Sequence, residues 1–204
     1  MIRLVLASSS PARLATLRSA GVEPQVVAPG VDEDAVLAAT AARHGELSPA
    51  DTALLLARAK ADAVLVDEGL VLGCDTVLEL DGWTHGKPAD AAEARRRWLT
   101  MRGQSGILRT GHWLADRRPE GTGGTRGEVA STVVHFADLT DEEIDAYIAT
   151  EEPLRVAGGF KVDGLGGAFV TGIEGDHHNV VGLSLPLLRR MLADLGVAWH
   201  ALWT

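Results

Sequence analysis

The feature that most constrains the fold is a carboxylate inside an apolar run that otherwise predicts a buried strand. Residues 70–78 read Leu-Val-Leu-Gly-Cys-Asp-Thr-Val-Leu, with Asp75 near the middle. A bare carboxylate in such a run costs several kcal/mol unless it is paired or binds a cation. Gly86-Lys87-Pro88 follows after Asp81-Gly82. This combination favours a metal and a phosphorylated substrate, and an Asp75 that caps a turn or pairs with Lys87 is the alternative.

The rest of the chain alternates strand and helix patterns, which predicts an α/β fold. We expect strands at 2–7, 24–28, 106–115 and 128–137, and helices at 11–20, 49–66, 91–101, 141–149 and 185–195. Serine, aspartate or threonine precedes the first four helices, as N-caps do. Asp81-Gly82 is a two-residue hairpin signal between 77–80 and 83–85.

Three segments resist assignment to regular elements. Residues 31–34 read as an acidic loop, and residues 158–175 contain so many glycines that a regular helix is not expected. Asp176-His177-His178 reads as a turn, without the spacing of a known metal motif. A surface or hydrogen-bonded role is the preferred interpretation of the two histidines.

Composition excludes several classes of protein. The net charge of −9 argues against a nucleic-acid partner, and Arg95-Arg96-Arg97 reads as a solvated helix face. No stretch has the roughly 20 apolar residues that a membrane helix needs, so no membrane partner is expected. The single cysteine, Cys74, excludes an internal disulfide and fits a reducing cytoplasm. Its side chain should point away from the face that carries Asp75 and pack in the core.

The junction between the first strand and the first helix has the character of an anion site. It reads Ser8-Ser9-Ser10-Pro11-Ala12-Arg13. A helix N-terminus offers free N–H groups and the positive end of the helix dipole, which suit a phosphate. Arg13 adds a cation where cations are otherwise disfavoured. An ordinary serine cap with a surface arginine is the alternative.

Two further candidates carry charge. Lys60 lies in line with Leu56 and Val64 on the predicted helix 49–66, which is its inward face. It either points into a cleft or extends to the edge of the core, where its ammonium reaches water. Asp32-Glu33-Asp34 could hold a hard cation through oxygen ligands, although acidic loops are usually solvated.

Several short motifs follow one another along nearly the whole chain. They are LVLASSSP at 4–11, VDE at 31–33, ARAKA at 57–61, GCDTV at 73–77, GKP at 86–88, TG at 110–111, EPL at 152–154, AGGF at 157–160, GLG at 164–166 and NVVGLSLP at 179–186. Taken together and in this order, they resemble the Maf family of nucleoside triphosphate pyrophosphatases.

The resemblance implies an α/β fold with a mixed twisted sheet and flanking helices, as in inosine triphosphate pyrophosphatases. It also implies one domain over residues 1–204, with two lobes around a deep cleft. The implied protein is a cytoplasmic, often dimeric enzyme with a house-cleaning role. It would cleave a nucleoside triphosphate between the α- and β-phosphates, with Mg²⁺ or Mn²⁺ as cofactor. The family name suggests an alternative, a regulator of septum formation that acts through protein contacts.

The resemblance also assigns roles to single residues. The catalytic acid, which would activate the attacking water, falls on Asp75, and it could share the metal with Glu33. The cleft lysines fall on Lys60 and Lys87. The phosphate-binding residues fall on Ser8, Ser10 and Arg13.

The chain departs from the family pattern at two places. Ala12 replaces the first of two common arginines, and Phe160-Lys161-Val162-Asp163-Gly164 replaces Tyr-Gly-Ile-Gln-Gly. These departures resemble the branch associated with 7-methyl-GTP more than the branch that prefers dTTP and UTP. Lys161 and Asp163 are therefore the expected base-reading residues, because an acid can accept hydrogen bonds from guanine or meet a cationic base.

Overall fold

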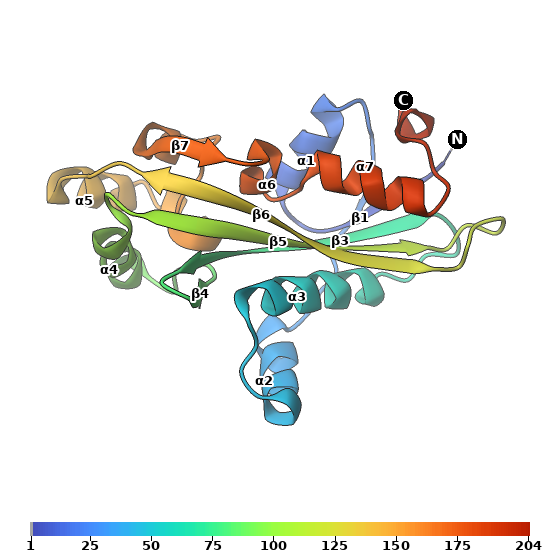
Figure 1. The fold of residues 1–204 in the computed structure, drawn as a ribbon, viewed down its shortest axis with the longest axis horizontal. Coiled ribbons are helices and arrows are strands. Elements are labelled where there is room, and N and C mark those ends of the chain that lie inside the picture. The colour runs from blue at the N-terminus through green and yellow to red at the C-terminus, as the bar shows by residue number, and fades with distance from the viewer. Residues whose placement is uncertain (1) are drawn as a thin grey trace.

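The computed structural model describes residues 2–204, and their centre is a mixed sheet of seven strands. The strands are β1 Leu4–Ala7, β2 Gln25–Val27, β3 Leu70–Leu80, β4 Trp83–His85, β5 Ser105–Asp116, β6 Thr125–Phe136 and β7 Val170–Glu174. Their order is β2-β1-β3-β5-β6-β7, and β4 pairs with β3. Strands β3, β5 and β6 are long and run through the whole molecule (Figure 1). The predicted α/β class and mixed sheet are confirmed.

The register of β3 leaves a gap along one of its edges. On one side, β5 pairs with residues 70–79 of β3. On the other side, β1 pairs with residues 70–73 and β4 with residues 78–80. Within the described chain, residues 74–77 therefore have no strand beside them on that edge. Asp75 lies in this gap.

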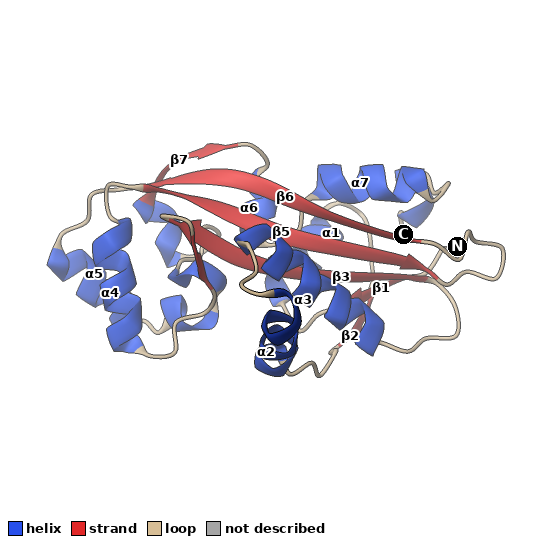
Figure 2. Ribbon diagram, turned by 60° about the horizontal axis from the view of Figure 1, so that its bottom comes forward, coloured by secondary structure: helices blue, strands red, loops and turns tan. Residues whose placement is uncertain are grey.

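Seven α-helices within residues 2–204 flank the sheet. They are α1 Pro11–Ser19, α2 Glu33–His44, α3 Pro49–Ala63, α4 Ala91–Met101, α5 Asp141–Ala149, α6 His177–Val181 and α7 Leu185–Asp194. Helices α1, α6 and α7 lie on one side of the long strands and α3 on the other, while α4 and α5 gather at one end (Figures 1 and 2). None of these helices is both long and apolar enough to cross a bilayer.

The core is divided into clusters that follow this arrangement. On one face of the sheet, α1 and α7 pack against β1 and β3, and Cys74 belongs to this cluster. On the other face, Ala61 of α3 and Val64, which follows the helix, pack against the same strands. At the far ends of β3, β5 and β6, α4 and α5 enclose Trp98. The buried Cys74 confirms the predicted packing role, and burial raises the pKa of its thiol to about 12.

The cap and turn signals of the sequence are confirmed where the structure tests them. Ser10, Ser48 and Asp90 each accept a hydrogen bond from a backbone N–H in the first turn of their helix, and Thr140 forms a full capping box. The hairpin between β3 and β4 turns at Asp81 and Gly82, whose φ angles are 50° and 82°. Positive φ at both positions is the requirement of a type I′ turn.

Several elements differ from those predicted. Residues 33 and 34 begin α2 instead of lying in a loop, and α2 itself was not predicted. The predicted helix 49–66 ends at Ala63, which is α3. The last residues of the glycine-dense segment form β7, and the two histidines begin the short α6. Helix α2 has no buried residue, so it lacks the apolar stripe by which an amphipathic helix is found in a sequence.

Two glycines bring α3 close to the sheet. A Cβ at Gly73 would lie 2.1 Å from the carbonyl oxygen of Ala57, and one at Gly111 would lie 2.2 Å from that of Ala53. Gly111 is the partner of Asp75 in the β3–β5 ladder. Because the missing side chains let the helix backbone touch the strands, α3 can present Lys60 to Asp75.

We expect Gly111→Ala to destabilise the protein strongly, since the new methyl group must push α3 away from β5. The free energy of unfolding, measured by urea denaturation, should fall by about 2 kcal/mol or more. Gly86→Ala is the matched control, because a Cβ there meets no atom within 4 Å. Its effect should stay within about 0.5 kcal/mol, and equal losses in both variants would contradict the close-packing argument.

Candidate active site

The gap beside β3 opens into a cavity of about 1760 Å³. Its walls come from the start of α1, from α2 and α3, from the β3–β4 hairpin and from residues 150–165. Every residue to which the sequence analysis assigned a role lines it, namely Ser8, Ser10, Arg13, Glu33, Lys60, Asp75, Lys87, Lys161 and Asp163. The cavity gathers these residues, but their chemical roles do not follow from this placement alone.

The centre of the cavity is an ionic cluster of three residues. The Lys60 ammonium lies 2.5 Å from Asp75 Oδ1 and 2.8 Å from Glu33 Oε1. Lys60 and Asp75 are both buried, with 9% and 7% of their surface exposed, whereas Glu33 is exposed. Lys60 therefore points into the cleft, and the partner of Asp75 is Lys60 and not Lys87.

The pKa of Asp75 reflects opposing effects. Burial raises the pKa of this carboxyl above its ordinary value of 3.8. The charges of Lys60 and Arg13 and the hydrogen bond from Lys60 act in the opposite direction, while Glu33 adds to the upward shift. Asp75 is thus a carboxylate whose proton affinity is enhanced by its site, as a general base requires.

Arg13 is a buried cation held by neutral groups. Its Nε donates to the carbonyl of Gly182 at 2.7 Å, Nη1 to Ser8 Oγ at 3.3 Å and Nη2 to Thr76 Oγ1 at 3.0 Å. Within residues 2–204 it forms no ion pair with a carboxylate, although 91% of its surface is buried. A buried charge without a counter-ion is costly, so the site is suited to an anion.

The segment before Arg13 caps helix α1 through Ser10 and brings a second hydroxyl, that of Ser8, to the guanidinium. Ser10 Oγ accepts from the backbone N–H of Arg13 at 3.4 Å, and Ser8 Oγ accepts from that of Ser10 at 3.1 Å. Ser8 is buried and also accepts from the Arg13 guanidinium. Serine and arginine therefore face the cavity together at the start of α1.

The acidic run 32–34 divides into three roles. Asp32 is the N-cap of α2 and accepts from the backbone N–H of Ala35 at 3.0 Å. Glu33 reaches back to Lys60, and Asp34 is exposed at the cavity wall. The three acids do not converge on one point, but Glu33 and Asp75, from different elements, do.

Lys87 lies in a segment that Arg97 holds in place. The carbonyl of Gly86 accepts from Arg97 Nη1 at 2.6 Å and from the backbone N–H of Gly158 at 3.1 Å. Arg97 is buried and pairs with Glu93. The prediction that Arg97 belongs to a solvated face was therefore wrong, because the guanidinium is buried and bonds to Glu93 on its own helix and to the Gly86 carbonyl before the helix.

Lys161 and Asp163 lie in a loop that a buried hydroxyl anchors. The Tyr147 hydroxyl donates to Glu152 Oε1 at 2.8 Å and accepts from the backbone N–H of Lys161 at 3.1 Å. Glu152 also accepts from the backbone N–H groups of residues 165 and 166. The ammonium of Lys161 lies 3.5 Å from Asp163 Oδ1, and both side chains are partly exposed to the cavity.

A buried polar network supports Arg13 from behind, and the sequence analysis assigned no role to its members. Thr76 Oγ1 lies 3.0 Å from Thr110 Oγ1, which donates to the carbonyl of Asn179. The Asn179 side chain donates to the carbonyl of Leu108, and His112 Nε2 accepts from the backbone N–H of Ser184. Residues 179–184, which hold Arg13, are thereby fixed to the sheet. The motifs TG at 110–111 and NVVGLSLP at 179–186, which contain Thr110 and Asn179, were the sequence signals that could have identified these residues.

Trp83 was also missed, because the tryptophans are scattered in the sequence. It follows the hairpin turn on β4, lines the cavity and has 65% of its surface exposed. An exposed indole in a cavity offers a flat apolar surface to a ligand.

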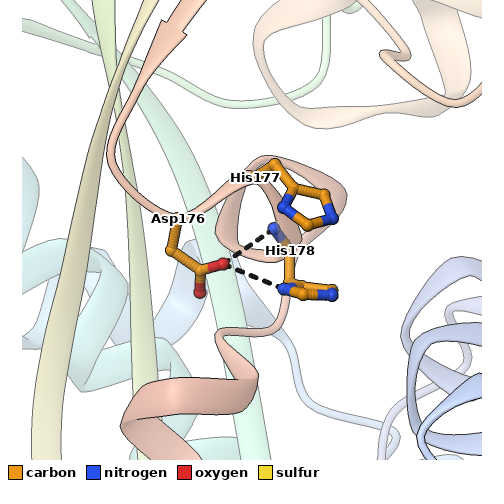
Figure 3. A group of neighbouring side chains, drawn as sticks. All are labelled: Asp176, His177 and His178. Carbon is orange, nitrogen blue, oxygen red and sulfur yellow. Dashed lines mark hydrogen bonds and ion pairs between the residues drawn. The ribbon is translucent and has the colours of Figure 1, made fainter.

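The two histidines lie outside the cavity lining. His178 Nδ1–H donates to Asp176 Oδ1 at 3.0 Å, and the ring centroid of His177 lies 3.8 Å from that of His178 (Figure 3). Asp176 Oδ1 also accepts from the backbone N–H of His178 as the cap of α6. The hydrogen-bonded interpretation of His178 is confirmed.

Comparison with known proteins identifies relatives along the whole chain. Residues 3–195 match the family described as Maf-like protein. A protein of Streptomyces coelicolor named nucleoside triphosphate pyrophosphatase is 55% identical over 205 residues, 98% of this chain and 94% of that protein. One of the same name from Salinispora tropica is 54% identical over 211 residues, covering 100% and 88%. The Staphylococcus aureus Ham1 structure is 15% identical with a TM-score of 0.42, over 67% and 72%.

The buried His112 predicts a pH-dependent stability. Because the Ser184 N–H can only donate, Nε2 must accept, and Nδ1–H donates to the carbonyl of Thr110 at 3.0 Å. Burial lowers the pKa of His112 from 6.5 to about 4. Between these values the unfolded chain binds a proton that the folded protein rejects. The stabilisation is therefore complete above pH 6.5 and is lost as the pH falls towards 4, by about 3 kcal/mol.

Urea denaturation between pH 7 and pH 4.5 measures this loss. The difference in unfolding free energy between the wild type and His112→Gln should shrink as the pH falls, since the variant has no proton to reject. His44→Gln, at an exposed position, should run parallel to the wild type. A constant difference for His112→Gln would contradict the assignment.

Proposed function

The chain belongs to the Maf family, and we propose that it hydrolyses nucleoside triphosphates between the α- and β-phosphates, releasing a monophosphate and pyrophosphate. Relatives that share about half of its residues along nearly their full length carry the name nucleoside triphosphate pyrophosphatase. The observation that carries the proposal is the buried Asp75 carboxylate, which lies in one cavity with a buried Arg13 that pairs with no carboxylate among residues 2–204.

The cations of the cavity support binding of a triphosphate. The chain has three lysines, Lys60, Lys87 and Lys161, and all three line the cavity. Arg13 and the start of α1 add further donors. In a protein with a net charge of −9, this concentration of positive charge opposes the overall field and favours an anion at one place. Lys60, Lys87, Ser8, Ser10 and Arg13 would hold the phosphates.

The donor set also fits a divalent cation. Glu33 and Asp75 direct carboxylate oxygens at one point, where the Lys60 ammonium already acts as a positive charge. Mg²⁺ and Mn²⁺ prefer oxygen ligands of this kind. Glu33 and Asp75 would hold the metal, which when bound neutralises charge that develops on the phosphates.

Asp75 would activate the attacking water. A carboxylate with a raised proton affinity can take a proton from water as the water attacks the phosphorus, whereas an ordinary carboxylate is a weaker base. Arg13 and the lysines would meanwhile stabilise the negative charge of the departing pyrophosphate. The chemistry thus needs little beyond positioning and fixed charges.

The base-reading end of the cavity favours a modified or non-standard nucleotide. Lys161 and Asp163 lie at the cavity wall on a loop that Tyr147 and Glu152 anchor. Asp163 can accept hydrogen bonds from a guanine edge or attract a cationic methylated base such as that of 7-methyl-GTP. Hydrolysis of such nucleotides would be a house-cleaning role in the cytoplasm.

Asp75→Asn tests the catalytic assignment. The amide cannot accept a proton from water, so turnover should fall on the order of 10²-fold or more. Pyrophosphate release from canonical and modified nucleoside triphosphates, with and without Mg²⁺ or Mn²⁺, is the measurement. Asp62→Asn is the control, because Asp62 lies on the same helix as Lys60 but pairs with Arg58 at the surface. Near-wild-type turnover of folded Asp75→Asn would refute the role.

Substitutions at Lys161 and Asp163 test the base-reading role. Lys161→Ala and Asp163→Ala should change the ratio of kcat/KM between nucleotides that differ in their base, because these side chains face the base and not the reacting phosphates. The same panel of triphosphates supplies the ratios. An equal loss of kcat/KM for every nucleotide would indicate a general binding role instead.

A further inference from the structure

The Lys60 ammonium touches both carboxylates that the proposed function assigns to the metal. It lies 2.5 Å from Asp75 and 2.8 Å from Glu33. A Mg²⁺–oxygen contact is shorter, at about 2.0–2.1 Å, but the ammonium contacts the same two carboxylates that would bind the metal. Lys60 is also almost fully buried. The Lys60 ammonium therefore occupies the position between the two carboxylates where the metal would bind.

A divalent ion and the ammonium cannot share this point. Each needs the oxygens of Glu33 and Asp75, and two cations a few ångströms apart repel each other strongly where water is scarce. Without any cation, the two carboxylates, which both lie within 2.8 Å of the Lys60 ammonium, would repel each other. The pair therefore requires one positive charge, and only one at a time.

We propose that Lys60 holds the place of the metal in the free enzyme and is expelled when the metal binds. This inference rests on the proposed metal site at Glu33 and Asp75. The lysine stem is long and flexible, and the cavity lies directly before it. Once displaced, the ammonium remains in the cavity that receives the triphosphate, where it is free to contact a phosphate oxygen.

The exchange links metal and phosphate binding. Metal entry must break two ion pairs, which weakens metal binding to the free enzyme. A phosphate that accepts the displaced ammonium compensates for this loss, so each ligand favours the other. Lys60 would thereby keep the site from retaining a metal in the absence of substrate.

Calorimetric titration of the substrate-free protein with Mn²⁺ tests the exchange without any turnover. Lys60→Met removes the competing charge at similar volume, so Mn²⁺ should bind at least about tenfold more tightly than to the wild type. Lys87→Met is the matched control. It removes one positive charge from the same cavity, but no carboxylate pairs with Lys87 in residues 2–204. Its effect on Mn²⁺ affinity should stay within about threefold.

A second variant and a second readout protect the test against misfolding. Lys60→Gln should show the same gain in affinity, and Mn²⁺ should raise the Tm of either Lys60 variant more than that of the wild type. Equal affinity in wild type and both variants, or weaker binding by the variants, would overturn the inference but leave the metal site intact. If neither the wild type nor any variant bound Mn²⁺ while the wild type still hydrolysed nucleotides, both the inference and the assignment of the metal site to Glu33 and Asp75 would be wrong.

Discussion

The contact between Lys60 and Asp75 is the interaction on which the site depends. It joins α3 to β3 where the edge of β3 is open between β1 and β4. The contact requires that the helix lie against the strands, and Gly73 and Gly111 permit this by leaving no side chain in the way. The close packing of α3 against the sheet thus determines where the Lys60 ammonium contacts the Asp75 carboxylate, and both residues line the cavity.

The second constraint is the buried charge of Arg13. Its partners are a carbonyl and two hydroxyls, which orient the guanidinium without neutralising it. Behind these partners, His112 and Asn179 tie the segment that holds Arg13 to the sheet. The network consists of neutral groups, so the positive charge of Arg13 remains available to a ligand. The same network therefore fixes residues 179–184 to the sheet and orients Arg13 for a ligand.

Sequence patterns gave the parts of the site that depend on local periodicity. Helical spacing was enough to place Lys60 on the inward face of α3, and the apolar run around Asp75 predicted that this carboxylate is buried. What the sequence could not give is pairing between distant elements. Helix α2 buries no residue and so offers no apolar stripe, and the Gly86 carbonyl that accepts from the buried Arg97 lies outside the helix that carries it. The partnership of Glu33 with Lys60 likewise exists only once α2 and α3 have folded.

The arrangement uses one set of cations for two tasks. In the free protein, Lys60 and Arg13 oppose the effect of burial and favour the ionised form of Asp75. In the proposed mechanism, the same cations bind the phosphates. A triphosphate that neutralises them also brings its own negative charge towards Asp75, and both effects raise the proton affinity of the carboxylate. A metal held by Asp75 would act in the opposite direction. The strength of the base during attack would therefore be set by the balance between the charge of the substrate and that of the metal.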